Sequence, residues 1–124
     1  MAKSITDAEL EIMRILWRED RPVTFAEMKA ELERTKGLSK STVNTHISRL
    51  RDKGVVTYLD KYGAAQYYPL VSEDEYILSE QTAVIEKLGG ARKFMAAMVR
   101  NGHLREEDID ELREYFKIGG ERDE

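Results

Sequence analysis

Residues 38–56, LSKSTVNTHISRLRDKGVV, have the pattern of one short amphipathic helix. Ser39 is a favoured helix N-cap, and Gly54 is a favoured stop at the other end. Between them, apolar residues recur at the spacing of a single helical face: Val43, Ile47 and Leu50. The other positions hold mainly Ser, Thr, Asn, Arg and Lys with one acid, in a chain whose net charge is -4. The helix therefore has an outer face that is unusually poor in carboxylates.

Two further helices are predicted upstream of this stretch. Residues 6–9 (TDAE) and residues 24–27 (TFAE) both have the capping-box pattern, in which a threonine N-cap is followed three residues later by glutamate. The first apolar periodicity runs to about Arg18, and Pro22 then breaks it. The second runs to about Arg34, and Lys36 and Gly37 are expected to stop it. The sequence thus predicts three short helices in its first 54 residues.

The periodicity changes after the third helix. Residues 55–59 (VVTYL) and 64–70 (AAQYYPL) are rich in β-branched and aromatic side chains, which are typical of strands. They flank the turn-like residues 60–63 (DKYG), in which Gly63 can adopt a positive φ. The order helix, helix, helix, hairpin predicts a winged helix-turn-helix in residues 1–70, with the hairpin as the wing.

Three more helices are predicted in the remainder of the chain, at about residues 72–88, 91–100 and 106–117. They are too few and too short to form a strong core alone, so their apolar faces need a partner surface. The simplest partner is a second copy of the chain, because most oligomers are symmetric dimers. The alternative is that these helices fold back on the winged helix of their own chain.

The fold class is accordingly mainly α with a small β-hairpin, and residues 71–124 are expected to form a helical dimerisation domain. The residues expected at the dimer contact are Ile77, Val84, Ile85, Leu88, Phe94, Met95, Met98, Val99, Ile109, Leu112, Tyr115 and Phe116.

The third helix is the candidate DNA reader, because the second helix of a helix-turn-helix pair lies in the major groove. Short polar side chains near its start can reach base edges, and Asn44 can pair with adenine through two hydrogen bonds. Arg49 and Lys53 are expected to contact phosphate, and Lys61 and Tyr62 lie at the tip of the wing. The residues predicted to contact DNA are Lys40, Ser41, Thr42, Asn44, Thr45, Ser48, Arg49, Lys53, Lys61 and Tyr62.

The distribution of charge supports this interpretation. Residues 36–61 contain six Lys and Arg against two acids, whereas residues 71–124 contain eight against 14. Local field rather than net charge governs attraction to phosphate. The alternative left open is a winged-helix module that binds protein instead of DNA.

Other functional classes find little support. The chain has no cysteine, which excludes disulfides and thiolate metal sites. It shows no nucleophile–base constellation, no phosphate-binding glycine loop and no cluster of metal ligands, so neither an enzyme nor a cofactor is expected. His46 has the residue type of a metal ligand or a pH sensor, but we expect it to be a half-buried packing residue. Without a signal peptide or an apolar run of about 20 residues, we expect a cytoplasmic protein with no membrane insertion.

Four segments carry a resemblance to a known family: 5–17 (ITDAELEIMRILW), 39–56, 67–76 (YYPLVSEDEY) and 105–116 (REEDIDELREYF). On these segments the chain resembles the BlaI/MecI penicillinase repressors, which are winged-helix regulators of bacterial β-lactam resistance. The resemblance covers nearly the whole chain in one register.

The resemblance implies a homodimer that is held by the C-terminal helices and represses transcription. It implies a double-stranded, palindromic operator with TACA/TGTA-type half-sites, and a membrane sensor protease or its effector as a further partner. Two departures from the family pattern are present. The family's cleaved Asn-Phe bond aligns with Ala97-Met98, and the family often has lysine at the position of Ser41 and glutamine or arginine at that of Asn44.

Overall fold

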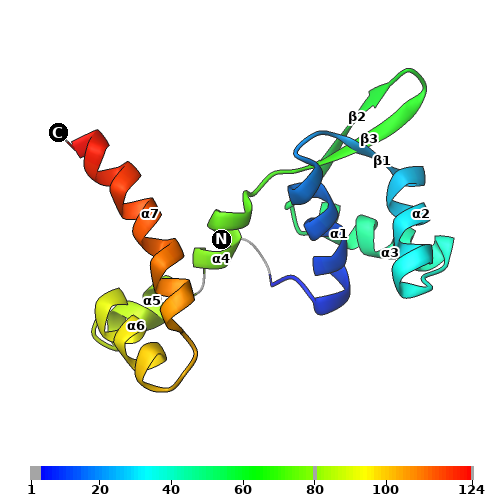
Figure 1. Ribbon diagram of the computed structural model, residues 1–124. Helices are drawn as coiled ribbons and strands as arrows, with labels where there is room; N and C mark the ends of the chain where they lie inside the picture. The colour runs from blue at the N-terminus through cyan, green and yellow to red at the C-terminus, as the bar shows by residue number, and fades with distance from the viewer. Residues whose placement is uncertain (1–3, 80, 124) are drawn as a thin grey trace. The chain divides into compact units, whose positions relative to one another are not determined.

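The computed structural model describes residues 4–79 and 81–123 (Figure 1). Within them the chain forms seven helices and a three-stranded sheet, as expected for a mainly α protein with a small β element. It divides into two compact units, Met1–Ser79 and Glu80–Glu124. The boundary expected from the sequence lies after residue 70, whereas the first compact unit extends to Ser79 and includes the segment that follows the hairpin.

The first three helices lie where they were predicted, at α1 (Asp7–Glu19), α2 (Phe25–Lys36) and α3 (Lys40–Asp52). Each has a hydroxyl N-cap whose oxygen accepts a hydrogen bond from the amide three residues further on: Thr6, Thr24 and Ser39. Such a cap satisfies one of the free amides at a helix start and contributes about 1 kcal/mol. The helix positions thus follow from local hydrogen bonding that the sequence reveals directly.

Two details of these helices differ from the prediction. Helix α2 extends two residues beyond the expected Arg34, to Lys36, although it stops at Gly37 as predicted, where φ is 66°. The capping box at Thr24 is only half formed, because the carboxylate of Glu27 contacts Arg21 at 3.0 Å instead of returning to the N-cap amide. The reciprocal box is complete only at the start of α1, among these three helices.

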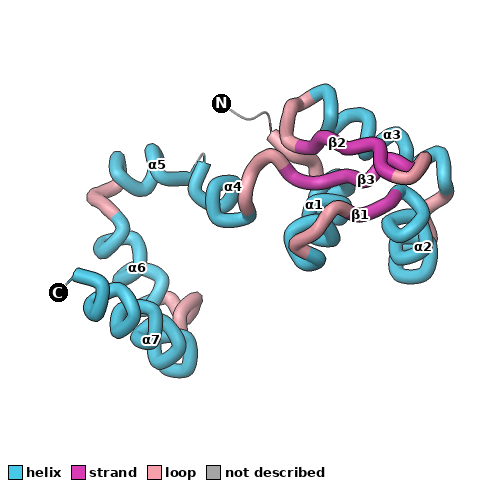
Figure 2. The backbone as a smooth tube through the Cα atoms, turned by 90° about the horizontal axis from the view of Figure 1, so that it is seen from above, coloured by secondary structure: helices cyan, strands magenta, loops and turns pink. Residues whose placement is uncertain are grey.

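The sheet contains one strand that the sequence analysis missed. Its strands β1 (Val23–Thr24), β2 (Val56–Lys61) and β3 (Ala64–Pro69) are antiparallel in the order β1-β3-β2 (Figure 2). With two residues, β1 is too short to show the alternation that identifies a strand. The hairpin turn is also tighter than expected, with only Tyr62 and Gly63 between the strands, at φ of 55° and 77°. Positive φ at both positions matches the type I′ turn that suits the twist of a hairpin.

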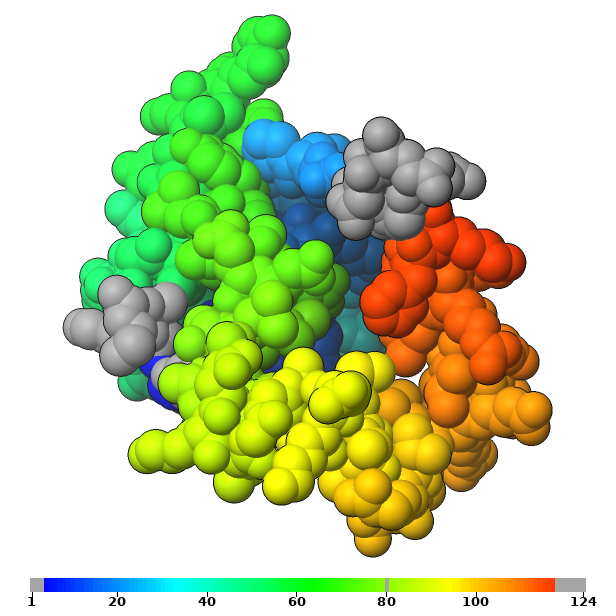
Figure 3. Space-filling model, turned by 90° about the vertical axis from the view of Figure 1, so that its left-hand side faces the viewer, coloured from blue at the N-terminus to red at the C-terminus, as the bar shows by residue number. Residues whose placement is uncertain are grey.

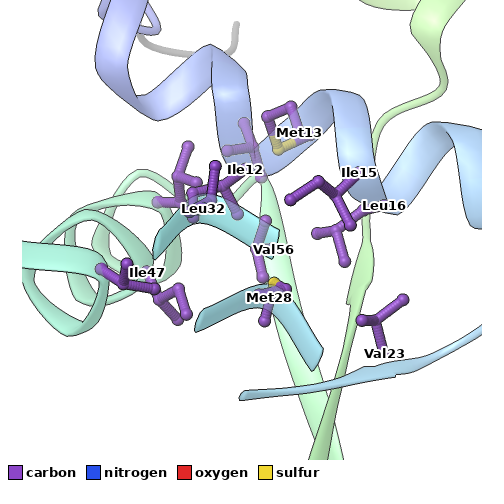
Figure 4. Close-up of a cluster of buried hydrophobic side chains, with 12 residues drawn as sticks. Ile12, Met13, Ile15, Leu16, Val23, Met28, Leu32, Ile47 and Val56 are labelled. Carbon is purple, nitrogen blue, oxygen red and sulfur yellow. The ribbon is translucent and has the colours of Figure 1, made fainter. Parts of the chain in front are cut away.

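One apolar core joins α1, α2, α3 and the sheet (Figure 4). The predicted inner face of α3 is buried as expected, with Val43, Ile47 and Leu50 at most 2% exposed. Burying one such side chain contributes about 1.5–3 kcal/mol, so this face fixes the rotation of α3 about its axis. The buried apolar set is Ile12, Met13, Ile15, Leu16, Val23, Met28, Leu32, Val43, Ile47, Leu50, Val55 and Val56.

Trp17 attaches the segment after the hairpin to this core. Its indole Nε1 donates to the carbonyl of Val71 at 3.0 Å, and its ring lies 5.9 Å from that of Tyr76. Tyr76 belongs to α4 (Glu73–Ser79), which explains why α4 groups with the N-terminal unit.

The helix predicted over residues 72–88 corresponds to two described helices rather than one. Helix α4 belongs to the first unit and α5 (Gln81–Lys87) to the second; residue 80 lies outside the described residues. The second unit continues with α6 (Ala91–Arg100), as predicted, and α7 (Glu106–Asp123), which runs beyond the expected end at residue 117. Among the described residues, no helix is both long enough and apolar enough to cross a membrane.

The second unit has no buried core among the residues whose side chains the structure describes. Of residues 81–117, whose side chains are described, none is buried. Phe94 on α6 is 41% exposed, and Phe116 on α7 is 78% exposed. Helices in globular proteins obtain most of their stability from packing an apolar face, so these faces require a further surface.

Candidate nucleic-acid interface

Packing of α3 leaves one polar face of the helix in solvent. With Val43, Ile47 and Leu50 directed into the core, the helical period places the polar residues on the outside. The exposed predicted residues of this helix are Lys40, Ser41, Asn44, Thr45, Ser48 and Arg49, while Thr42 is half-buried at the edge of the face. The structure thus brings six of the predicted contacts together on one surface.

Hydrogen bonds already occupy some of the hydroxyls near the start of α3. The Ser39 hydroxyl donates to Thr42 Oγ1 at 2.9 Å, and the Thr45 hydroxyl donates to the carbonyl of Ser41 at 2.9 Å. Thr45 therefore has its oxygen lone pairs and its methyl group left for a ligand. In the described part of the chain Asn44 makes no side-chain hydrogen bond, so both its amide donors and its carbonyl oxygen are available.

The cation of Lys53 is directed inward, toward α1. Its Nζ donates to the carboxylate of Glu9 and, at 2.9 Å, to the carbonyl of Ser4. Glu9 is 1% exposed. Burial raises the pKa of this carboxyl, but the hydrogen bonds from Lys53 and Thr6 outweigh that effect and lower the pKa overall. Lys53, predicted to contact phosphate, is thus already bound to a carboxylate, whereas no carboxylate pairs with Arg49 within the described residues.

The tip of the wing carries the remaining predicted residues. Tyr62 is 93% exposed, and the Nζ of Lys61 lies 5.5 Å from the centroid of its ring. Figure 3 shows the hairpin as a narrow projection beyond the neighbouring atoms of its own unit. The wing therefore presents a cation and an aromatic ring away from the core, where they can reach a ligand that lies along α3.

One residue of this surface was missed in the sequence analysis. Arg51 is exposed in the last turn of α3, and its guanidinium carbon lies 4.5 Å from the centroid of the Tyr58 ring on β2. Spacing within the helix gave no signal for this contact, because Tyr58 follows in a different element. The sequence did show the two residue types of this contact, an arginine in the predicted third helix and a tyrosine in the strand predicted after it.

Three further predictions concern metal binding, His46 and the dimer contact. Among the described residues, no group of three or more His, Cys, Asp or Glu side chains could hold a metal ion. His46 is half-buried, as expected, and its Nδ1 is buried with no hydrogen-bond partner among the described residues. The residues predicted to form the dimer contact are exposed or half-buried in the single chain: Ile77, Val84, Ile85, Leu88, Phe94, Met95, Met98, Val99, Ile109, Leu112, Tyr115 and Phe116.

A capped helix-turn-helix, a projecting hairpin and a carboxylate-poor outer face on α3 define a winged-helix DNA-binding protein. The sequence profile described as "Penicillinase repressor" matches residues 5–118. The chain belongs to the penicillinase repressor family, whose members are DNA-binding transcriptional repressors and not enzymes.

Individual relatives agree with this assignment. The chain is 28% identical over 110 residues to the penicillinase repressor of Bacillus licheniformis, covering 87% of this chain and 85% of that protein. It is 30% identical over 111 residues to the methicillin resistance regulatory protein MecI of Staphylococcus aureus strain N315, covering 88% and 89% of the two chains.

Two solved structures of BlaI also match part of this chain. The DNA-binding domain of the repressor BlaI matches with a TM-score of 0.54 at 32% identity, covering 61% of this chain and 94% of that one. The monomeric form of Bacillus licheniformis BlaI in complex with the blaP half-operator matches with a TM-score of 0.54 at 30% identity, covering 61% and 92%.

Proposed function

We propose that this protein binds a palindromic operator as a homodimer, with α3 of each protomer in the major groove, and thereby blocks transcription. The observation that carries the proposal is the outer face of α3, where Asn44 and Arg49 are exposed and unpaired within the described residues. A related BlaI is solved in complex with a half-operator, which supports the same use of the matching unit here. The site of action is then the cytoplasm, where the bacterial chromosome lies.

Each exposed group on α3 has a chemical task in this proposal. Asn44 reads a base edge, because its amide can donate and accept at once and so matches adenine in the major groove. Ser41, Thr45 and Ser48 supply shorter contacts beside it, while Lys40 and Arg49 bind phosphate and fix the register. Lys61 and Tyr62 contact the backbone or the minor groove from the wing tip.

The dimer is proposed from the C-terminal unit. None of its side chains in residues 81–117 is buried in the single chain, although α6 and α7 carry large apolar residues. A second copy covers both sets at once in an isologous contact. Two recognition helices then address two half-sites, which matches the two-fold symmetry of a palindrome. A membrane sensor protease, or its effector, is proposed as the partner that relieves repression.

The role of Asn44 is tested by scanning base pairs in the operator. Wild-type protein and Asn44→Ala are titrated against duplexes in which each A·T pair of the operator is replaced in turn. Wild type is expected to lose about 1–3 kcal/mol of binding free energy at one pair, and Asn44→Ala to be indifferent to that pair. Asn101→Ala, which removes an asparagine at the end of α6, is the control. If wild type and Asn44→Ala respond alike to every base-pair replacement, Asn44 does not read a base.

A further inference from the structure

Arg51 occupies the junction between the recognition helix and the wing. It lies in the last turn of α3, and α3 packs against β2 (Figure 2). Its guanidinium carbon is 4.5 Å from the centroid of the Tyr58 ring, within the range of a cation–π contact. A guanidinium that stacks on a ring keeps its N–H donors directed outward in the plane of the group.

The ring beneath Arg51 is itself held in place. Tyr58 pairs directly with Tyr67 across β2 and β3, and the centroids of the two rings are 5.7 Å apart. Tyr67 in turn packs against the buried core. Arg51, Tyr58 and Tyr67 therefore form a continuous series of contacts from the surface to the core, and these contacts limit the freedom of a long, exposed side chain.

The charge of Arg51 is not neutralised within the described residues. No carboxylate lies within ion-pair distance of it there, not even that of the adjacent Asp52. By contrast, Lys53 is bound to Glu9, and Arg18 is bound to Glu19 and Glu31. A cation that is oriented by a ring but has no anion has its hydrogen-bonding capacity free for a ligand.

We propose that Arg51 binds a backbone phosphate where the DNA duplex passes from α3 to the wing, and that Tyr58 is the positioning residue that orients it. The inference rests on the proposed binding of α3 in the major groove. Arginine suits this place because its planar fork can give two parallel hydrogen bonds to phosphate oxygens. A contact to phosphate carries no sequence information but fixes the angle of the helix in the groove. The phosphate contact assigned from sequence to Lys53 thus falls to Arg51, two residues earlier.

The test is a set of anisotropy titrations of the full chain on operator duplex over a series of salt concentrations. Loss of one phosphate contact lowers the slope of log affinity against log salt by about one. Arg51→Ala is expected to show this decrease and to bind about tenfold more weakly at low salt. Arg51→Lys keeps the charge and should retain the wild-type slope. Arg14→Ala, on the side of α1 that faces away from its buried residues, is the matched control and should change neither quantity.

The positioning role of Tyr58 is tested in the same titrations. Tyr58→Phe keeps the ring and should bind like wild type, whereas Tyr58→Leu should bind several-fold more weakly. Because Tyr58 acts through Arg51, adding Tyr58→Leu to Arg51→Ala should weaken binding no further. Far-UV circular dichroism of each variant shows that the fold is retained.

The outcomes separate this inference from the proposed function. A wild-type protein that does not distinguish operator from scrambled DNA would overturn the operator proposal and the Arg51 contact with it. If wild type does distinguish them but Arg51→Ala keeps the wild-type slope, only the Arg51 contact is overturned. An additive effect of Tyr58→Leu in the Arg51→Ala background would overturn the positioning role.

Discussion

Lys53, the residue that follows α3, donates a hydrogen bond to the buried carboxylate of Glu9 in the first turn of α1. The same carboxylate oxygen accepts from the amide of Thr6, and Lys53 also reaches the carbonyl of Ser4. One ion pair thus joins the start of α1 to the end of the recognition helix across 44 residues of sequence. We interpret it as the contact that fixes the C-terminal end of α3 against α1.

The two partners of this pair should respond differently to substitution. Lys53→Met leaves the carboxylate of Glu9, which is 1% exposed, buried without its cation, and we expect a loss of about 3 kcal/mol in the free energy of unfolding. Glu9→Gln leaves Lys53, whose side chain is 20% exposed and can turn to water, so a loss of about 1–2 kcal/mol is expected. Urea denaturation measures both.

Glu11→Gln is the control for the ion pair. Glu11 pairs with Arg14 on the exposed side of the same helix, where such a pair contributes little. We expect a change within about 0.5 kcal/mol. Equal losses in Lys53→Met and Glu11→Gln would contradict the importance of the buried pair.

The ion pair also predicts a dependence of stability on pH. The pKa of Glu9 is lower in the folded protein than the ordinary value of 4.5, so the folded state binds this proton more weakly than the unfolded state. Its contribution is therefore fully present above pH 4.5 and is lost as the pH falls through the folded pKa. Thermal unfolding at pH 7 and at about pH 3 should show wild type losing more stability than Glu9→Gln. Parallel losses in the two proteins would argue against this assignment.

Tyr62 in the wing turn is expected to be strained in its backbone and also to contact DNA. Tyr62 has a φ of 55°, a region that aromatic residues rarely adopt, whereas asparagine adopts it readily at this position of a type I′ turn. We expect Tyr62→Asn to stabilise the N-terminal unit by about 0.5–1 kcal/mol and, in the proposed complex, to weaken binding to operator DNA. Chemical denaturation and anisotropy titration measure the two effects. A variant that gains stability and binds unchanged would remove Tyr62 from the DNA contact.

The exposed apolar residues of α6 predict a stability that depends on protein concentration. If a second copy covers Phe94, then Phe94→Glu should shift the sedimentation of the protein from dimer to monomer. The thermal midpoint of wild type should rise with protein concentration, and that of the variant should not. Lys93→Glu introduces an acid across α6 from the centre of the apolar face formed by Phe94, Met95, Met98 and Val99, and this variant should remain dimeric. Monomeric wild-type protein at micromolar concentration would contradict the proposed dimer.

Local signals predicted most of the N-terminal fold. The caps at Thr6, Thr24 and Ser39 and the apolar stripe on α3 are properties of a few neighbouring residues, and all of them reappear in the structure. Strand β1 was missed because two residues show no periodicity, and Val23 pairs with Tyr67, far along the chain.

The candidate site was predicted less completely, because its geometry depends on contacts between distant residues. Lys53 and Arg51 look equivalent in sequence, since both are cations near the end of one helix. The structure distinguishes them: Lys53 meets Glu9, 44 residues earlier, and Arg51 meets the ring of Tyr58 on a strand. Helical spacing predicts neither Glu9 nor Tyr58 as a partner, because both residues lie in other elements.

The most direct test of the central claim is an anisotropy titration of the wild-type protein with the promoter DNA beside its own gene. It should be run against a scrambled duplex of the same composition, at two salt concentrations. An operator reader should prefer its own DNA by about a thousandfold or more and should bind more weakly as salt rises. Equal and weak binding to both duplexes would contradict the account and would favour a protein ligand for the winged helix.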